Sequence, residues 1–291
     1  MRLKLEDKVA IVTGSGRGIG KAIALAFAKE GADVVVLSRT QSEVAETATR
    51  AKALGRQALV LKADVSKKED VERIVRSTMH EFGKVDVLVN NAGILGPVGP
   101  VVDDDAEKWI KTVNINLIGT FLCTKTVLPI MIKRRQGKII NLSGGGATGP
   151  RPRFSAYATS KAAVVRFTET LAEEVKEFNI QINAIAPGAL NTQMHDQVLA
   201  VGEAAGEKEL ALSRRVKEGR GTPFELPVGL AVFLASDESN GLTGRLISAV
   251  WDDWRGMSRE RIEEIMSREL YTLRRIDDFF FTHIERQPEK K

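Results

Sequence analysis

The feature that most constrains the fold is an alternation of short apolar runs with longer amphipathic segments along most of the chain. The runs are rich in Val, Ile and Leu, and the segments between them have helical periodicity. Strands that are continuously apolar are buried on both faces of a sheet, so helices must cover both sides. We therefore predict a doubly wound parallel α/β sheet in three αβα layers, with a ligand crevice at the carboxyl ends of the strands. The predicted strands are Val9–Val12, Val34–Leu37, Ala58–Lys62, Val85–Asn90, Lys138–Leu142, Gln181–Ala186 and a last one at Leu246–Val250.

A glycine-rich turn follows the first predicted strand and opens a helical pattern from Lys21 to Lys29. Its sequence is Thr13-Gly14-Ser15-Gly16-Arg17-Gly18-Ile19-Gly20. Glycines let a backbone turn tightly and approach a ligand, and the free amides at a helix start attract phosphates. We interpret the turn as a pyrophosphate cradle, although glycine clusters also form plain turns.

Length and composition divide the chain into one domain and a tail. The 291 residues suffice for a single α/β domain, which we expect to span residues 1–250. Residues 190–225 lose strand character after Pro187-Gly188, and we interpret them as a mobile substrate lid over the crevice. In the C-terminal extension, residues 251–291, we predict a helix capped by Ser258 and frayed ends at 286–291. The apolar face of that helix comprises Ile262, Ile265, Met266, Leu273 and Ile276.

Several signals point to a cytoplasmic protein. The first residues carry charges where a signal peptide would be apolar, and no apolar run has transmembrane length. Cys123 is the only cysteine, which excludes an internal disulfide. The three histidines, His80, His195 and His283, lack metal-site spacing. We therefore expect no membrane role and no catalytic metal.

The net charge of +5 would suit a nucleic-acid partner, but the distribution of the charges does not. Basic residues are interleaved with acids, and no basic stripe with aromatic side chains is present. We expect no nucleic-acid binding. Arg151, Arg153 and the cluster Arg214-Arg215-Lys217-Arg220 instead leave open an anionic substrate, such as a phosphorylated sugar or a carrier-bound acyl group.

Tyr157 and Lys161 form a candidate acid–base pair. They lie four residues apart in a helical pattern that runs to Phe178, so they share one helix face. A free tyrosine has a pKa of about 10, which is too high for efficient proton transfer near neutral pH. A neighbouring ammonium group can lower that pKa. A tyrosine packed under a surface lysine would have the same spacing.

Taken together, the motifs resemble the classical short-chain dehydrogenase/reductase family over about residues 5–250. The resemblance rests on the order and spacing of the glycine turn, Asp64-Val65, Asn90-Asn91-Ala92-Gly93, Asn116, Tyr157 to Lys161, and Pro187-Gly188 followed by Thr192. It implies a Rossmann-like fold and an oxidoreductase that interconverts a carbonyl and an alcohol. It also implies a homodimer or homotetramer formed through the helices that include residues 116–131 and 157–178.

The resemblance further implies a role for each of these residues. Tyr157 would exchange a proton with the substrate oxygen, and Lys161 would bind the nicotinamide ribose and lower the tyrosine pKa. Asn116 would hold a water that links this lysine to solvent. The remaining positions would bind the cofactor, with Asp64 and Val65 at the adenine and Thr192 at the nicotinamide amide. They are Gly14, Ser15, Arg17, Gly18, Ile19, Gly20, Asp64, Val65, Asn90, Asn91, Ala92, Gly93, Pro187, Gly188 and Thr192.

The end of the second strand favours NADP(H) over NAD(H). Ser38 occupies the position where NAD-preferring relatives carry an aspartate, and Arg39 follows it. A guanidinium group suits a 2′-phosphate. Arg17 in the glycine turn would add a second positive charge.

Two departures from the family pattern affect the substrate side. The serine expected thirteen positions before Tyr157 is replaced by Gly144, and Ser143 lies one position earlier. We rank Ser143 as the best replacement, with Ser155 or a backbone amide as alternatives. Loss of one such donor typically lowers the rate 10²- to 10³-fold. A nicotinamide-binding regulatory or scaffold protein therefore remains the competing interpretation.

The second departure is the ending of the last strand. Trp251-Asp252-Asp253-Trp254 replaces the family's acidic-diglycine ending. The two tryptophans could pack within the chain or against a neighbouring subunit, cover the active site, or contact a sugar-like ligand.

Overall fold

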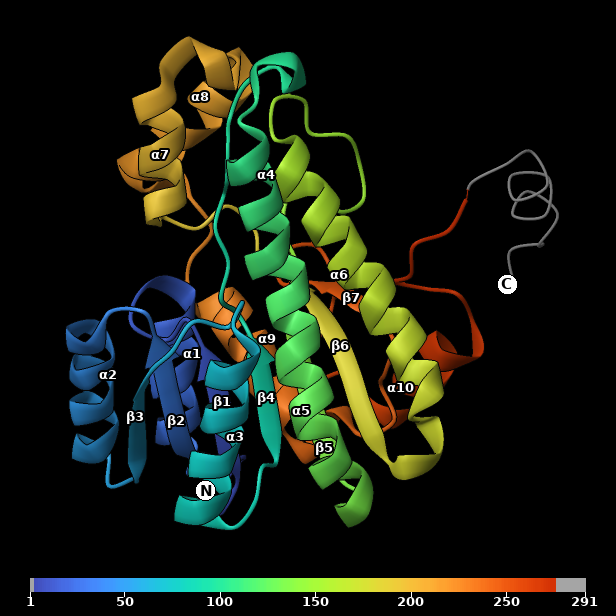
Figure 1. The fold of residues 1–291 in the computed structure, drawn as a ribbon. Coiled ribbons are helices and arrows are strands. Elements are labelled where there is room, and N and C mark those ends of the chain that lie inside the picture. Colours follow the sequence, from blue (N-terminus) through green and yellow to red (C-terminus); the bar gives the residue numbers. More distant parts are fainter. Residues whose placement is uncertain (1–2, 276–291) are drawn as a thin grey trace, which may run out of the picture.

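The computed structural model describes residues 3–275 and contains one seven-stranded parallel sheet (Figure 1). The strand order is β3-β2-β1-β4-β5-β6-β7. Strands β2 and β3 are added on one side of β1, and β4 and the later strands are added on the other side. This order confirms the predicted doubly wound fold, whose switch point lies beside the glycine turn. The strands are β1 Val9–Thr13, β2 Asp33–Ser38, β3 Ala58–Lys62, β4 Val87–Asn90, β5 Gly137–Leu142, β6 Ile180–Ala186 and β7 Leu246–Ser248.

Helices cover both faces of the sheet, as the apolar strands require. In β1, Ala10 and Val12 point into one hydrophobic cluster, whereas Ile11 points into the other, because successive side chains of a strand alternate. The first cluster is closed by α1, α2, α9 and α10, and the second by α3, α5 and α6. The helices are α1 Gly18–Lys29, α2 Gln41–Ala53, α3 Lys68–Phe82, α4 Ala106–Val113, α5 Gly119–Arg134, α6 Ser155–Glu174, α7 Gln193–Val201, α8 Glu207–Arg215, α9 Glu225–Ala235 and α10 Arg259–Ser267.

Several predicted boundaries shift by a few residues. The first helix begins at Gly18, inside the glycine turn, rather than at Lys21. The helix that carries Tyr157 ends at Glu174, and Lys176–Phe178 forms a separate 3₁₀ turn. Other 3₁₀ turns are Val101–Asp103, Gly202–Ala205 and Asp237–Ser239, and π-helical turns are Asn114–Ile118 and Val216–Arg220.

One continuous helical segment corrects our expectation that no apolar run has transmembrane length. Residues 106–134, which include α4 and α5, are long and apolar enough to cross a membrane by length and composition alone. The same composition is found in core helices of soluble proteins. Here α5 packs on the sheet, where Cys123, Val127 and Met131 are buried in the second hydrophobic cluster.

The predicted lid is largely helical. It contains α7 and α8, which lie beyond the carboxyl ends of the strands, beside the N-terminal end of α4 (Figure 1). The sequence lost its strand pattern here because these residues form short helices.

The C-terminal extension packs into the first hydrophobic cluster. Ser258 caps α10 by accepting a hydrogen bond from the Arg261 amide at 3.3 Å, as predicted. Ile262 and Ile265 are buried, with Met266 packed beside them, whereas Leu273 contacts a separate small cluster. Ile276, His283 and residues 286–291 lie outside the described part of the chain.

The two tryptophans of the extension have different environments. Trp254 is only 6% exposed, packs at a tilt against Phe233 of α9 and donates its indole N–H to the Ala249 carbonyl. Trp251 is 87% exposed. Packing within the chain therefore explains the position of Trp254 but not that of Trp251.

Candidate active site

The glycine turn is shaped for a close backbone approach. Gly14 and Gly18 have φ values of +64° and +54°, a region that L side chains rarely adopt. A Cβ on Gly20 would lie 2.4 Å from the Gly14 carbonyl oxygen, so the turn packs tightly against the helix start. The side chain of Arg17, the N-cap residue, does not cap α1, and the first turn of this helix contains no acidic residue. Its first amides can therefore receive a phosphate.

Other motif residues brace this turn rather than face a ligand. The Ser15 side chain is buried, and its Oγ accepts the Leu37 amide of β2 at 2.9 Å. Asn91 donates from Nδ2 to the carbonyl oxygens of Thr13 and Gly14 at 2.8 and 3.1 Å. These contacts fix the turn against β2 and β4.

Asn90 likewise belongs to an internal network. Its Nδ2 donates to Thr124 Oγ1 of α5 and to Asn141 Oδ1 of β5, and Asn141 in turn donates to Thr168 of α6. The side chain is buried. The structure therefore places Asn90 where it ties two strands to two helices.

At the end of β2, the structure adds an acidic residue that sequence reasoning missed. Ser38 Oγ is engaged with the backbone of Thr40, and Arg39 is exposed. Glu43, in the first turn of α2, lies 3.5 Å from Arg17 Nη1. A Cβ on Gly16 would be 2.9 Å from its Oε2, so the carboxylate faces the glycine turn. One of the two predicted phosphate-binding arginines is therefore already paired.

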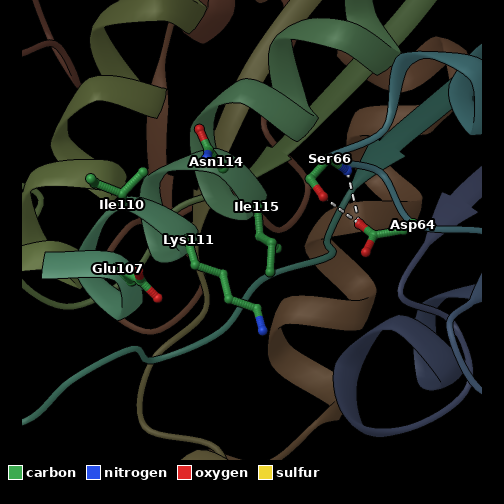
Figure 2. Close-up of a pocket in the computed structure, with 7 residues that line it drawn as sticks. All are labelled: Asp64, Ser66, Glu107, Ile110, Lys111, Asn114 and Ile115. Atoms are coloured by element: carbon green, nitrogen blue, oxygen red, sulfur yellow. Dashed lines mark hydrogen bonds between the residues drawn. The ribbon is translucent and has the colours of Figure 1, made fainter. Parts of the chain in front are cut away.

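A cavity of about 300 Å³ opens beside Asp64, between the β3–α3 loop and α4 (Figure 2). Asp64 Oδ1 accepts hydrogen bonds from the amide and hydroxyl of Ser66 at 3.0 and 2.7 Å. Ile110 and Ile115 add apolar wall on the other side (Figure 2). Val65 packs against the start of α5, where a Cβ on Gly119 would lie 2.7 Å from its Cγ2. The cavity has the mixed polar and apolar lining that a heteroaromatic ring requires.

Tyr157, Lys161 and Asn116 come together at the carboxyl end of β5. Lys161 Nζ donates to the Leu142 carbonyl at 2.7 Å. Asn116, in the π-helical turn, exchanges two hydrogen bonds with the backbone of Ile94 and donates to Ser160 Oγ on α6. Gly93 lies beside both, because a Cβ there would be 3.1 Å from Asn116 Oδ1 and 3.5 Å from Lys161 Nζ.

The electrostatics of this group differ from the sequence expectation. Burial lowers the pKa of Lys161 to about 8. Burial also raises the pKa of Tyr157, and the guanidinium of Arg151 opposes that rise. In the protein alone, the cation that favours the tyrosine anion is therefore Arg151, a residue the sequence suggested only for anion binding.

Position 144 faces the tyrosine, as the sequence count indicates. A Cβ on Gly144 would lie 2.5 Å from Tyr157 Oη. Ser143 is buried and its Oγ points to the Lys161 carbonyl oxygen at 3.4 Å. Ser155 accepts from Trp109 Nε1 at 3.0 Å and donates to Asp104 at 3.1 Å. Both candidate hydroxyls are thus engaged elsewhere.

Side chains of the loop after β5 contact the segment predicted to form a lid. Arg151 donates from Nε and Nη2 to the two carboxylate oxygens of Glu209 in α8, at 2.9 and 2.7 Å. Arg153 donates to the Ala204 carbonyl. One apolar cluster joins Leu95, Phe154 and Tyr157 to Val198 and Ala205 of this segment.

The loop after β6 reaches back to the glycine turn. Gly188 has φ of +82°, and a Cβ there would collide with Thr222 Oγ1 at 2.4 Å, so this loop passes close to the start of α9. The Thr192 methyl would lie 3.7 Å from a Cβ on Gly18. Of the predicted residues in this loop, Thr192 is thus the one that the structure places beside the glycine turn.

These elements fit a dinucleotide: a helix start that can receive phosphates, a cavity beside Asp64 after β3, and a lysine near a tyrosine at the end of β5. Comparison with known proteins agrees. Residues 8–201 match the short chain dehydrogenase family, and the chain belongs to this family.

The relatives have varied chemistry. A 3-oxoacyl acyl-carrier-protein reductase of Thermotoga maritima is 38% identical over 246 residues, covering 84% of this chain and 97% of the relative. Galactitol 2-dehydrogenase of Agrobacterium fabrum is 35% identical over 259 residues, covering 87% and 99%. The solved structure of an NAD⁺-bound xylitol dehydrogenase has a TM-score of 0.78 at 31% identity, covering 84% of this chain and 98% of that one. The chain is thus an oxidoreductase of a family that binds NAD(P)(H).

Proposed function

We propose that this protein is an NADP(H)-dependent oxidoreductase that interconverts a carbonyl with a secondary or primary alcohol. The observation that carries the proposal is the grouping of Tyr157, Lys161 and Asn116 at the end of the crevice that begins with the glycine turn. When bound, the nicotinamide supplies or accepts the hydride. Tyr157 gives a proton to the substrate oxygen in reduction and takes it in oxidation.

Each end of the crevice has its own residues in this proposal. The α1 amides, with Gly14 and Gly18 at the turn, hold the pyrophosphate, and Asp64 and Val65 flank the adenine. Lys161 binds the nicotinamide ribose, and Asn116 orients the segment around Ile94 and holds a water. Ser15, Asn90 and Asn91 act through the backbone they brace.

The preference for NADP(H) is supported by Arg39. This side chain is exposed at the end of β2 and makes no ion pair or hydrogen bond with other residues in the described range 3–275. It is therefore available to a 2′-phosphate. Glu43 works in the opposite direction, because it neutralises Arg17 and would repel a phosphate.

The substrate is more consistent with an uncharged carbonyl compound than with an anion. Arg151 is paired with Glu209, Lys217 with Asp196, and Arg220 with Glu218, while Arg153 bonds to backbone carbonyls. Most of the basic residues that could have bound an anionic substrate are thus already paired within the protein. Leu95, Phe154 and Val198 form an apolar cluster with Tyr157, so the surroundings of the tyrosine are apolar.

We retain a cytoplasmic location and a homodimer or homotetramer as parts of the proposal. Ile118 and Phe121 are exposed apolar side chains within residues 116–131, one of the two helical segments where an oligomer interface is expected. A molar mass from light scattering tests the assembly directly. A monomer at micromolar concentration would contradict it.

Tyr157→Phe tests the chemistry. The variant keeps the ring and loses only the hydroxyl, so it should bind NADPH with unchanged affinity and lose at least about 10³-fold in turnover. The assay follows NADPH consumption with ethyl acetoacetate, cyclohexanone and benzaldehyde. If the wild-type protein binds NADPH but reduces none of these, the regulatory or scaffold interpretation is favoured.

A pair of variants tests cofactor choice. Arg39→Ala should lower the preference for NADPH over NADH about tenfold or more, since a charged hydrogen bond to the phosphate is lost. Glu43→Gln should raise that preference. A wild-type advantage for NADH that persists in Arg39→Ala would refute the NADP(H) assignment.

A further inference from the structure

Three consecutive glycines beside the tyrosine make room for specific neighbours. A Cβ on Gly144 would meet the Tyr157 hydroxyl. A Cβ on Gly145 would lie 3.5 Å from Arg151 Nη1 and 3.7 Å from its Cζ. Gly146 has φ of +90°, and a Cβ there would lie 3.1 Å from Arg151 Cβ. Gly144 and Gly146 are therefore the positions that need glycine, whereas Gly145 would make only ordinary contacts with Arg151, which lies over this loop next to Tyr157.

Arg151 is held in a defined orientation. Its Cζ lies 4.2 Å from the centre of the Phe154 ring and 5.5 Å from the centre of the Tyr157 ring. Nε and Nη2 are both engaged by Glu209, and the two side chains are each 16% exposed. Within residues 3–275, Nη1 makes no hydrogen bond. One donor group of a guanidinium that lies over the Tyr157 ring, and near the residue next to Gly144, thus remains available.

The proposed reaction needs a donor at this place. Negative charge develops on the substrate oxygen when the carbonyl is reduced, and a preorganised donor besides Tyr157 stabilises it. The hydroxyls of Ser143 and Ser155 are directed to Lys161 and Asp104. Position 144, which faces the tyrosine, has no side chain.

We propose that Arg151 is this donor: Nη1 donates a hydrogen bond to the substrate oxygen that exchanges a proton with Tyr157, in place of a hydroxyl at position 144. This inference rests on the proposed carbonyl reduction. The Glu209 carboxylate offsets the positive charge of the guanidinium only in part, and the free N–H group can donate to the oxygen of an uncharged ketone or aldehyde. Glu209 is the positioning residue, and it makes substrate binding depend on α8 lying over the site.

The experiment compares Arg151→Met with Glu209→Gln. Arg151→Met removes the donor and should lower kcat for ethyl acetoacetate reduction about 10²- to 10³-fold without changing NADPH affinity. Glu209→Gln retains an acceptor for the guanidinium and leaves Nη1 in place, so its loss should stay within about tenfold. The double variant Arg151→Met/Glu209→Met leaves no unpaired carboxylate, which guards against misfolding, and should be as slow as Arg151→Met.

A conservative variant separates donation from anchoring of α8. Arg151→Lys keeps a cationic N–H donor but cannot hold Glu209 through two parallel hydrogen bonds, so its kcat should be at least about tenfold higher than that of Arg151→Met. Equal losses in Arg151→Met, Arg151→Lys and Glu209→Gln would overturn the role of Arg151 but not that of Tyr157. No turnover in the wild-type protein would reject both proposals. Unchanged turnover in Tyr157→Phe would reject the proposed function.

Discussion

The two walls of the crevice are built by different means. On the proposed cofactor side, the groups that would face the ligand belong largely to the backbone of the glycine turn, which side-chain-to-backbone hydrogen bonds of Ser15 and Asn91 hold in place. On the proposed substrate side, Arg151 and Glu209 meet across 58 residues of sequence and tie the loop after β5 to α8. One wall is therefore backbone braced by side chains, and the other depends on a pair of side chains. A ligand common to a whole family suits the first, and a variable substrate suits the second.

The largest expected effect is on the free energy of unfolding, and it shows whether the C-terminal extension belongs to one wall of the crevice or to the hydrophobic core beneath both. Trp254 packs on α9, where a Cβ on Gly229 would lie 3.0 Å from its ring, and α9 packs against α1. Trp254→Ala should therefore lower the free energy of unfolding by about 3–5 kcal/mol. Trp251→Ala, at an exposed site, should change it by less than about 0.5 kcal/mol. Urea unfolding measures both values.

If both variants were as stable as the wild-type protein but had slower turnover, the extension would instead form part of the substrate site. Equal and large losses of stability would indicate that Trp251 is covered in the assembled protein.

The next largest expected effect is on NADPH affinity and concerns the glycine turn. Gly20→Ala forces a Cβ against the Gly14 carbonyl and Asn91 Nδ2, both within 2.5 Å of its position. The turn must shift, so NADPH affinity should fall about 10- to 100-fold, measured by fluorescence titration. Gly149→Ala is the matched control, because a Cβ there meets nothing within 4 Å and the residue does not need positive φ. Unchanged affinity in Gly20→Ala would mean that the turn is not the phosphate site.

The difference between the walls also explains what could be predicted from sequence. Apolar runs dictated the sheet, and the glycine turn and the Tyr157–Lys161 spacing marked the crevice, because each signal lies within a few residues. The contact of Arg17 with Glu43 and the clamp of Arg151 by Glu209 depend on segments that only tertiary folding brings together. The spacing placed Gly144 opposite Tyr157 correctly, but not the directions in which Ser143 and Ser155 point.

Lys161 joins the two walls, and its titration should have opposite effects on binding and on stability. Burial lowers its pKa from 10.5 to about 8, so the ammonium is present below about pH 8 and is lost above it. Because the charged form binds the ribose in our proposal, NADPH affinity should fall by up to about tenfold as the pH rises through 8. The unfolded chain holds this proton up to about pH 10.5, so the free energy of unfolding should rise between pH 8 and 10.5.

Lys161→Met should abolish both pH dependences at this site. Lys138 is the matched control, because burial lowers its pKa to about 7 and it donates to Ser239 and Asn240 rather than to crevice residues. Lys138→Met should therefore alter the pH dependence of stability while leaving that of NADPH affinity unchanged. If Lys161→Met kept the wild-type fall in affinity above pH 8, another group would control the nicotinamide end, and the lysine would belong to the structural core rather than to the junction of the two walls.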